Sequence, residues 1–115
     1  MLYRGMGKNF PYGNGVVFME EEKLYIVTHP LRLRILRVLE REGSLYVNQI
    51  VEKLKGEGVD VDRKLVSYHL SRLLQYGLVE GEFKLMNPSK GYAVAVKYFR
   101  LTDEAKRILS RIRNL

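Results

Sequence analysis

The chain has 115 residues, of which 46% are hydrophobic and 29% charged, a composition typical of one soluble globular domain with a small core. It contains no cysteine, which excludes disulfides, thiolate metal sites and a cysteine nucleophile. Its formal net charge of +7 favours an anionic partner, with nucleic acid ahead of a membrane surface.

Residues 1–19 differ from the rest of the chain. They are rich in glycine and aromatic residues and show no helical period, so we expect a flexible N-terminal arm. Residues 15–19, "GVVFM", also suit a short edge strand. Glycines and polar residues interrupt every apolar stretch of the arm, and no apolar run approaches the roughly 20 residues of a membrane span. We therefore expect a cytoplasmic protein without membrane contact.

A helical pattern begins at Glu20, where acidic residues occupy a first turn. Pro30 suits the first position of a second helix, which ends at Gly43. That helix has an apolar stripe, and its arginines, Arg32 among them, fall mostly on the opposite face. A short strand is predicted at residues 45–47, and Asn48 is expected to cap a third helix.

The fourth helix carries the main candidate site. It is predicted over residues 62–76, with Asp62 as its N-cap, and it ends at Gly77. One face is apolar, with His69 beside it. The other face carries short polar, aromatic and basic residues: Arg63, Lys64, Ser67, Tyr68, Ser71 and, at the edge, Arg72.

Beyond Gly77 the hydrophobic period changes to two, which predicts a hairpin over residues 78–101. The loop "NPSKG" places Lys90 at its tip, and Lys84 and Lys97 lie along its strands. The alternation places Val79, Phe83 and Leu85 on one side of the first strand. On the second strand we expect a packed face formed by Tyr92, Val94, Val96 and Tyr98. Thr102 is expected to cap a last helix with a regular apolar stripe.

This order of elements predicts a mainly helical domain with a small hairpin, arranged α-α-β-α-α-β-β-α, over residues 20–115. Two helices joined by a tight polar turn, the second basic on its outer face and followed by a hairpin, are typical of a winged helix-turn-helix.

Two segments resemble a known family. "THPLRLRILRVLEREG" and "VSYHLSRLLQYGLVE" are similar to the second-helix and recognition-helix signatures of ArsR-type regulators. The resemblance implies a dimeric DNA-binding transcriptional regulator, often a repressor, whose first and last helices form the dimer. It also implies that Ser67 and Tyr68 lie at base edges. This sequence differs from the metal sensors of the family, because its third helix has no cysteine pair and its last helix has no histidine. We therefore expect no metal or other cofactor, and the sequence does not define an effector.

The polar face of the fourth helix suits a reader of the DNA major groove. Lys64 can donate a hydrogen bond to guanine, and Ser67 and Ser71 can bond to either base of a pair. Tyr68 can contact phosphate or a thymine methyl group. Arg63 and Arg72 would clamp phosphates, and Lys90 would touch the backbone or the minor groove. The alternative for this face is ordinary solvation, and for Lys90 a charge that discourages edge pairing.

A catalytic role for His69 would need a nucleophile or a carboxylate oriented on it, and the sequence offers none. We expect a half-buried histidine that supports the helix by a hydrogen bond, and we do not expect an enzyme. The alternative function is a winged-helix module that binds other proteins, which would expose aliphatic residues on the outer face of the fourth helix.

The first and last helices are the candidate dimer interface. Their apolar stripes, doubled across a two-fold axis, would be buried by a second copy. The residues concerned are Leu24, Val27, Ile108, Leu109 and Ile112. The alternative is that the last helix only covers the core of its own domain.

Overall fold

The computed structural model describes the backbone of residues 14–86, 91 and 94–113, and their side chains from Glu21 onward. Five helices and three strands follow one another in these residues: α1 (Asn14–Val27), α2 (Pro30–Glu42), β2 (Ser44–Tyr46), α3 (Val47–Gly56), α4 (Arg63–Gln75), β3 (Val79–Met86), β4 (Val94–Leu101) and α5 (Asp103–Arg113). This order confirms the predicted winged helix-turn-helix. None of the described helices has the length and hydropathy to cross a membrane.

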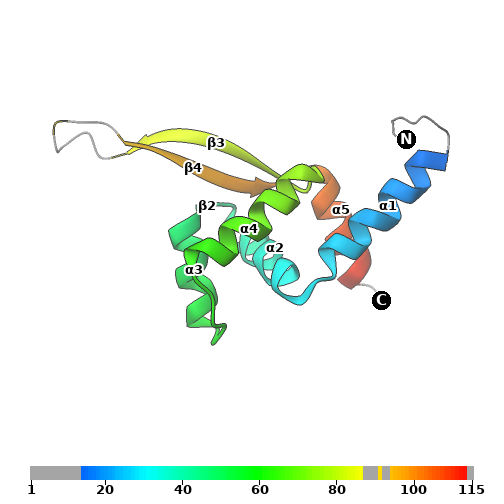
Figure 1. Ribbon diagram of the computed structural model, residues 1–115, viewed down its shortest axis with the longest axis horizontal. Coiled ribbons are helices and arrows are strands. Elements are labelled where there is room, and N and C mark those ends of the chain that lie inside the picture. Colours follow the sequence, from blue (N-terminus) through cyan, green and yellow to red (C-terminus); the bar gives the residue numbers. More distant parts are fainter. Residues whose placement is uncertain (1–13, 87–90, 92–93, 114–115) are drawn as a thin grey trace.

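The three strands form one antiparallel sheet in the order β2-β4-β3. Leu45 of β2 lies opposite Phe99 of β4, and Val79 of β3 lies opposite Leu101 of the same strand. The β3–β4 hairpin projects from one end of the molecule, whereas α1 and α5 lie at the other end (Figure 1). The sheet thus covers the helices only at its base, and the rest of the hairpin forms the wing.

The length of the hairpin explains why the packed face predicted for β4 is formed only in part: Val96 and Tyr98 are partly buried, whereas the outer end of the hairpin is exposed. Val79, Phe99 and Leu101 are buried, but Phe83 and Leu85 on the same side of β3 are 66% and 74% exposed. On β4, Val94 is 46% exposed, and Tyr92 lies outside the described residues. Strand period identified the hairpin correctly, but it carries no information on how far the strands extend beyond the helices.

The first helix begins earlier than predicted. Helix α1 starts at Asn14, six residues before the expected boundary at Glu20, so residues 15–19 are helical and form neither arm nor strand. Residues 1–13 lie outside the described part of the chain. The apolar and polar residues of α1 are not separated into two faces, which is why the periodicity of this segment did not indicate a helix.

Helix α2 runs through the centre of the core and contacts α1, α3, α4 and the sheet. Pro30 occupies its first turn, as predicted, and the Nδ1 atom of His29 accepts a hydrogen bond from the backbone N–H of Leu31 at 3.2 Å. The expectation that its arginines face solvent is wrong for Arg32, which is only 7% exposed. The buried apolar residues of the helix are Ile35, Leu36, Val38 and Leu39.

The two helices of the helix-turn-helix have well-defined ends. Helix α3 begins at Val47, and the side-chain oxygen of Gln49 accepts a hydrogen bond from the N–H of Tyr46 at 3.1 Å, so Asn48 is not the cap that we expected. Asp62 caps α4, as predicted. At the other end Gly77 has a φ of 70°, and the N–H of Leu78 bonds to the carbonyl of Leu73 at 2.9 Å, which closes α4 with a Schellman motif.

Candidate nucleic-acid interface

The outer face of α4 is polar and exposed along its whole length. Buried residues of the helix, Val66, Leu70 and Leu73 among them, hold its inner face against the core. At about 100° per residue, Lys64, Ser67, Tyr68 and Ser71 point away from this buried side. All four are exposed, and the ring of Tyr68 is 55% accessible. The structure therefore brings together four of the predicted readers on one surface.

One further residue on this surface was not predicted. Gln75, in the last turn of α4, is exposed and shares the same side of the helix as Lys64 and Ser71. Its Oε1 atom accepts a hydrogen bond from the guanidinium of Arg72 at 3.4 Å. An amide is a good partner for adenine, and helical spacing from Ser71 would have been the signal that identifies it.

An arginine lies at each edge of the face, and the two differ in exposure. Arg63 is exposed at one edge, near the wing, and Arg72 is partly buried at the other, where its guanidinium carbon lies 5.6 Å from the ring centre of Tyr76. The hydroxyl of Ser71 donates to the carbonyl of Tyr68 at 2.7 Å, which leaves its oxygen as an acceptor. Lys90, the predicted contact at the wing tip, lies outside the described residues.

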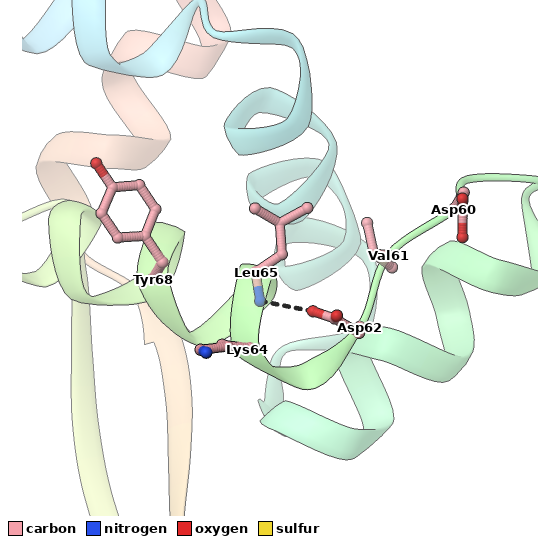
Figure 2. Close-up of a pocket in the computed structure, with 6 residues that line it drawn as sticks. All are labelled: Asp60, Val61, Asp62, Lys64, Leu65 and Tyr68. Atoms are coloured by element: carbon pink, nitrogen blue, oxygen red, sulfur yellow. Dashed lines mark hydrogen bonds between the residues drawn. The ribbon is translucent and has the colours of Figure 1, made fainter.

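A shallow hollow lies beside the first turn of α4 (Figure 2). Lys64, Leu65 and Tyr68 of the helix line it together with the turn that precedes the helix. Asp62 accepts a hydrogen bond from the N–H of Leu65 at 2.8 Å, drawn as the dashed line in the figure. Because Asp60 and Asp62 also line the hollow, it is unsuited to a phosphate.

A second hollow lies on the other side of α4, at the base of the wing. Arg63, Asn48 and Lys97 line it together with Tyr46, Val47, Ala95 and Val96. Two cations and the first turn of α3, where backbone N–H groups favour negative charge, thus meet in one place. This side of α4 suits an anion, in contrast to the acidic hollow on the opposite side.

Three arginines of α2 pair with carboxylates, whereas the two cations in the first turn of α4 do not in the described residues. On α2, Arg34 and Arg41 pair with Glu57, and Arg37 pairs with Glu40. In the described part of the chain, neither Arg63 nor Lys64 pairs with a carboxylate. Cations without an internal partner are available to an external anion.

His69 lies behind the outer face of α4 with a hydrogen-bond partner, as predicted, but it is buried and not half-buried. It is 5% exposed, and its Nδ1 atom lies 3.3 Å from a guanidinium nitrogen of Arg32. The ring of His29 is 4.8 Å away, centre to centre. Burial and, secondarily, the proximity of His29 and Arg32 lower the pKa of His69. Within the described residues, no three histidine or acidic side chains are grouped as metal ligands.

The candidate dimer residues lie at the end of the molecule opposite the wing. Helices α1 and α5 are joined there by an ion pair of 2.6 Å between Lys23 and Glu104. Leu24 and Ile112 are partly buried, whereas Val27, Ile108 and Leu109 are already buried in the core of the chain itself. Dimerisation through these residues remains a prediction, and only the first two have surface left for a partner.

Comparisons with known proteins agree with this geometry. Residues 27–82 match the helix-turn-helix domain family, whereas no curated protein matches the chain. A PadR family transcriptional regulator from Eggerthella lenta shares 23% identity at a TM-score of 0.57, over 90% of this chain and 83% of its own.

Two further solved structures are similar. The homodimeric winged helix-turn-helix DNA-binding domain of a possible ArsR-family transcriptional regulator from Mycobacterium bovis shares 18% identity, with a TM-score of 0.60 over 90% of this chain and 84% of that one. The antimony-specific transcriptional repressor AntR shares 19%, with a TM-score of 0.56 over 97% and 83%. Residues 27–82 are therefore similar to a helix-turn-helix domain, and the chain has a winged helix-turn-helix fold.

Proposed function

We propose that the chain is a sequence-specific regulator of transcription that binds double-stranded DNA as a homodimer. The observation that carries the proposal is the outer face of α4, where Lys64, Ser67 and Tyr68 are exposed side by side on a helix with a rigid inner face. A helix of this kind fits the major groove, where each base pair presents its own pattern of donors and acceptors. A DNA-bound regulator of this type would act in the cytoplasm, and repression is the mode expected from AntR.

In this arrangement, Lys64, Ser67, Tyr68 and Ser71 read base edges, and Arg63 and Arg72 contact phosphates. The wing, to whose tip the sequence assigns Lys90, lies against the backbone or the minor groove. The anionic preference of the hollow between Arg63 and Lys97 supports this orientation, because it places the phosphate backbone between α4 and the wing.

The homodimer is proposed through α1 and α5. Its support is the homodimeric state of the Mycobacterium bovis domain and the position of both helices at the end of the chain away from the wing. Among the side chains that the structure describes at this end, Tyr25 of α1 is the most exposed large hydrophobic one, at 76%. Leu24 and Ile112 keep partly open surfaces beside it. A two-fold axis at this end that runs parallel to the outward direction of the polar face would direct both copies of α4 to the same side of the dimer.

The alternative, a module that binds other proteins, predicts a continuous aliphatic patch on α4. Leu65 and Leu74 are each 39% exposed, but they lie about 180° apart around the helix, at opposite edges of the polar face. The face between them is polar, which favours DNA. An enzymatic function has no support in the described residues, since His69 has neither a carboxylate nor a nucleophile beside it.

The test is selection of duplexes from a random-sequence library by the purified protein at physiological salt, followed by sequencing. We expect enrichment of one motif with two-fold symmetric half-sites, because a homodimer presents two copies of α4. The affinity of the enriched duplex, measured by fluorescence anisotropy, should exceed that of a scrambled duplex by about 10³-fold or more. Equal recovery of all sequences would contradict the proposal, and enrichment of an asymmetric single site would contradict its dimeric part.

A further inference from the structure

A buried arginine connects three helices directly behind the reading face. Arg32 lies on α2 and is 7% exposed. Its Nε donates to the carbonyl of Ile26 in the last turn of α1 at 2.7 Å, and a terminal nitrogen lies 3.3 Å from Nδ1 of His69 on α4. The next residue of α4, towards its N-terminus, is the proposed reader Tyr68, whose ring centre is 5.1 Å from that of His69.

The hydrogen-bond partners of the Arg32 guanidinium are neutral groups. No carboxylate pairs with Arg32 in the part of the chain that the structure describes. It is held instead by a carbonyl at the C-terminal end of α1, which carries partial negative charge, and by an imidazole nitrogen. Buried arginines normally have ionic partners, so this contact depends on the imidazole nitrogen of His69 remaining unprotonated.

Nδ1 of His69 can accept from Arg32 only while the ring is neutral. In the imidazolium form, the N–H at Nδ1 would point at the N–H of the guanidinium. The positive charge of the ring would then lie next to that of Arg32. The ionisable groups that face His69 are Arg32 from α2 and His29 from the turn before it, with Tyr68 on its own helix. None of these carries a negative charge at neutral pH, so nothing there would stabilise the imidazolium.

We propose that Arg32 is a positioning residue for DNA reading, which fixes the neutral ring of His69, and through it the orientation of Tyr68, relative to α1. The proposal rests on the proposed function of α4. It predicts that protonation of His69 releases the contact and impairs reading. The direction in which DNA recognition changes with pH distinguishes this proposal from a general charge effect. General electrostatics predicts tighter DNA binding in acid, because the protein gains positive charge, whereas release of the reading helix predicts a loss of specificity.

The first test compares histidine variants, since His29 and His69 are the only histidines of the chain. His69→Asn keeps an acceptor near the position of Nδ1 but cannot titrate, and His29→Asn is the matched control because asparagine is also a good N-cap. The ratio of affinities for the selected and scrambled duplexes is measured from pH 7.5 down to pH 4.5 at constant ionic strength, because the pKa of His69 is lowered by burial. We expect the wild-type ratio to fall by about 5- to 150-fold, the discrimination of one base contact, and the His29→Asn ratio to fall alike. The His69→Asn ratio should stay constant. A wild-type ratio that is constant or rises in acid would overturn the proposal, as would an equal fall in His69→Asn.

The second test uses Arg32→Met, which replaces the guanidinium with an apolar side chain of similar length and leaves no buried charge. We expect unchanged helical content and a selected-to-scrambled ratio reduced by a similar factor already at pH 7.5. NMR titration of free protein should show the pKa of His69 moving up in the variant, since a nearby cation has been removed. An unchanged ratio, or an unmoved His69 titration, would overturn the positioning role. If wild-type protein selects no DNA, the proposed function fails, and the titration still decides whether Arg32 holds His69.

Discussion

The N-cap of α4 offers a sharp test because two aspartates line the same hollow and only one of them caps the helix. Asp62 accepts a hydrogen bond from the N–H of Leu65 at 2.8 Å, whereas Asp60, in the same hollow, makes no hydrogen bond within the described residues (Figure 2). Asp62→Ala should therefore destabilise the protein by about 1 kcal/mol, within a range of about 0.5–2, as for other N-cap losses. Asp60→Ala should have almost no effect.

The magnitude can be expressed as a melting temperature. At about 2.1 cal/mol/K per residue, the unfolding entropy of a 115-residue chain is about 0.24 kcal/mol/K. The loss of the cap should thus lower Tm by about 4 °C, measured by circular dichroism. Asp62→Asn keeps a capping oxygen and should lie close to wild type. Equal losses for Asp60→Ala and Asp62→Ala would refute the assignment of the cap.

DNA binding should separate the same variants. Both alanine variants remove a negative charge beside α4, so both should bind scrambled duplex somewhat more tightly. Only Asp62→Ala frays the first turn that carries Arg63 and Lys64, so only this variant should lose discrimination between the selected and scrambled duplexes. If Asp60→Ala loses discrimination as well, the first turn of α4 is not what positions these side chains.

Three other substitutions test the support of α4 and the acid stability of the fold. Gly77→Ala should cost about 1–2 kcal/mol in urea unfolding, because residue 77 has a φ of 70° that only glycine adopts without strain. Leu70→Ala should cost about 2–5 kcal/mol in the same assay, because Leu70 is 1% exposed and leaves a cavity behind α4. Burial alone would raise the pKa of Glu40, but hydrogen bonds from Arg113 and Arg37 lower it below its ordinary value of 4.5. The carboxylate thus stabilises the fold above pH 4.5, and this contribution is lost as the pH falls through the lowered pKa, so wild type should exceed Glu40→Gln in stability at pH 6 but not at pH 3.

The fold was predictable because its signals are local. Pro30, Gly43 and Gly77 mark the ends of helices by their backbone requirements alone, and the change of period after Gly77 identifies the hairpin. The start of α1 was not predictable, since Gly15 and two valines after it are poor helix formers and the helix has no amphipathic pattern. Its helical state must therefore depend on tertiary or intermolecular contacts.

The outer face of the site and the supporting role of His69 were predictable from the sequence, but the burial of Arg32 behind them was not. Helical spacing alone placed Lys64, Ser67 and Tyr68 on one side of α4, whereas the same spacing assigned Arg32 to solvent. Arg32 is buried because its guanidinium reaches the carbonyl of Ile26 and the ring of His69, a residue 37 positions away in the sequence. No local pattern encodes a contact of this range. The exposure of Phe83 and Leu85 likewise depends on the distance by which the wing extends beyond the helices.

The most direct test of the central claim, that α4 reads base edges, compares Tyr68→Ala and Lys64→Ala with Arg63→Ala on the selected and scrambled duplexes as salt is varied. We predict that the first two lose about 1–3 kcal/mol on the selected duplex only and relax its sequence preference. Arg63→Ala should weaken both duplexes alike and reduce the salt slope by about one unit. Equal losses on both duplexes for all three variants would contradict the claim and leave α4 as a basic surface without sequence recognition.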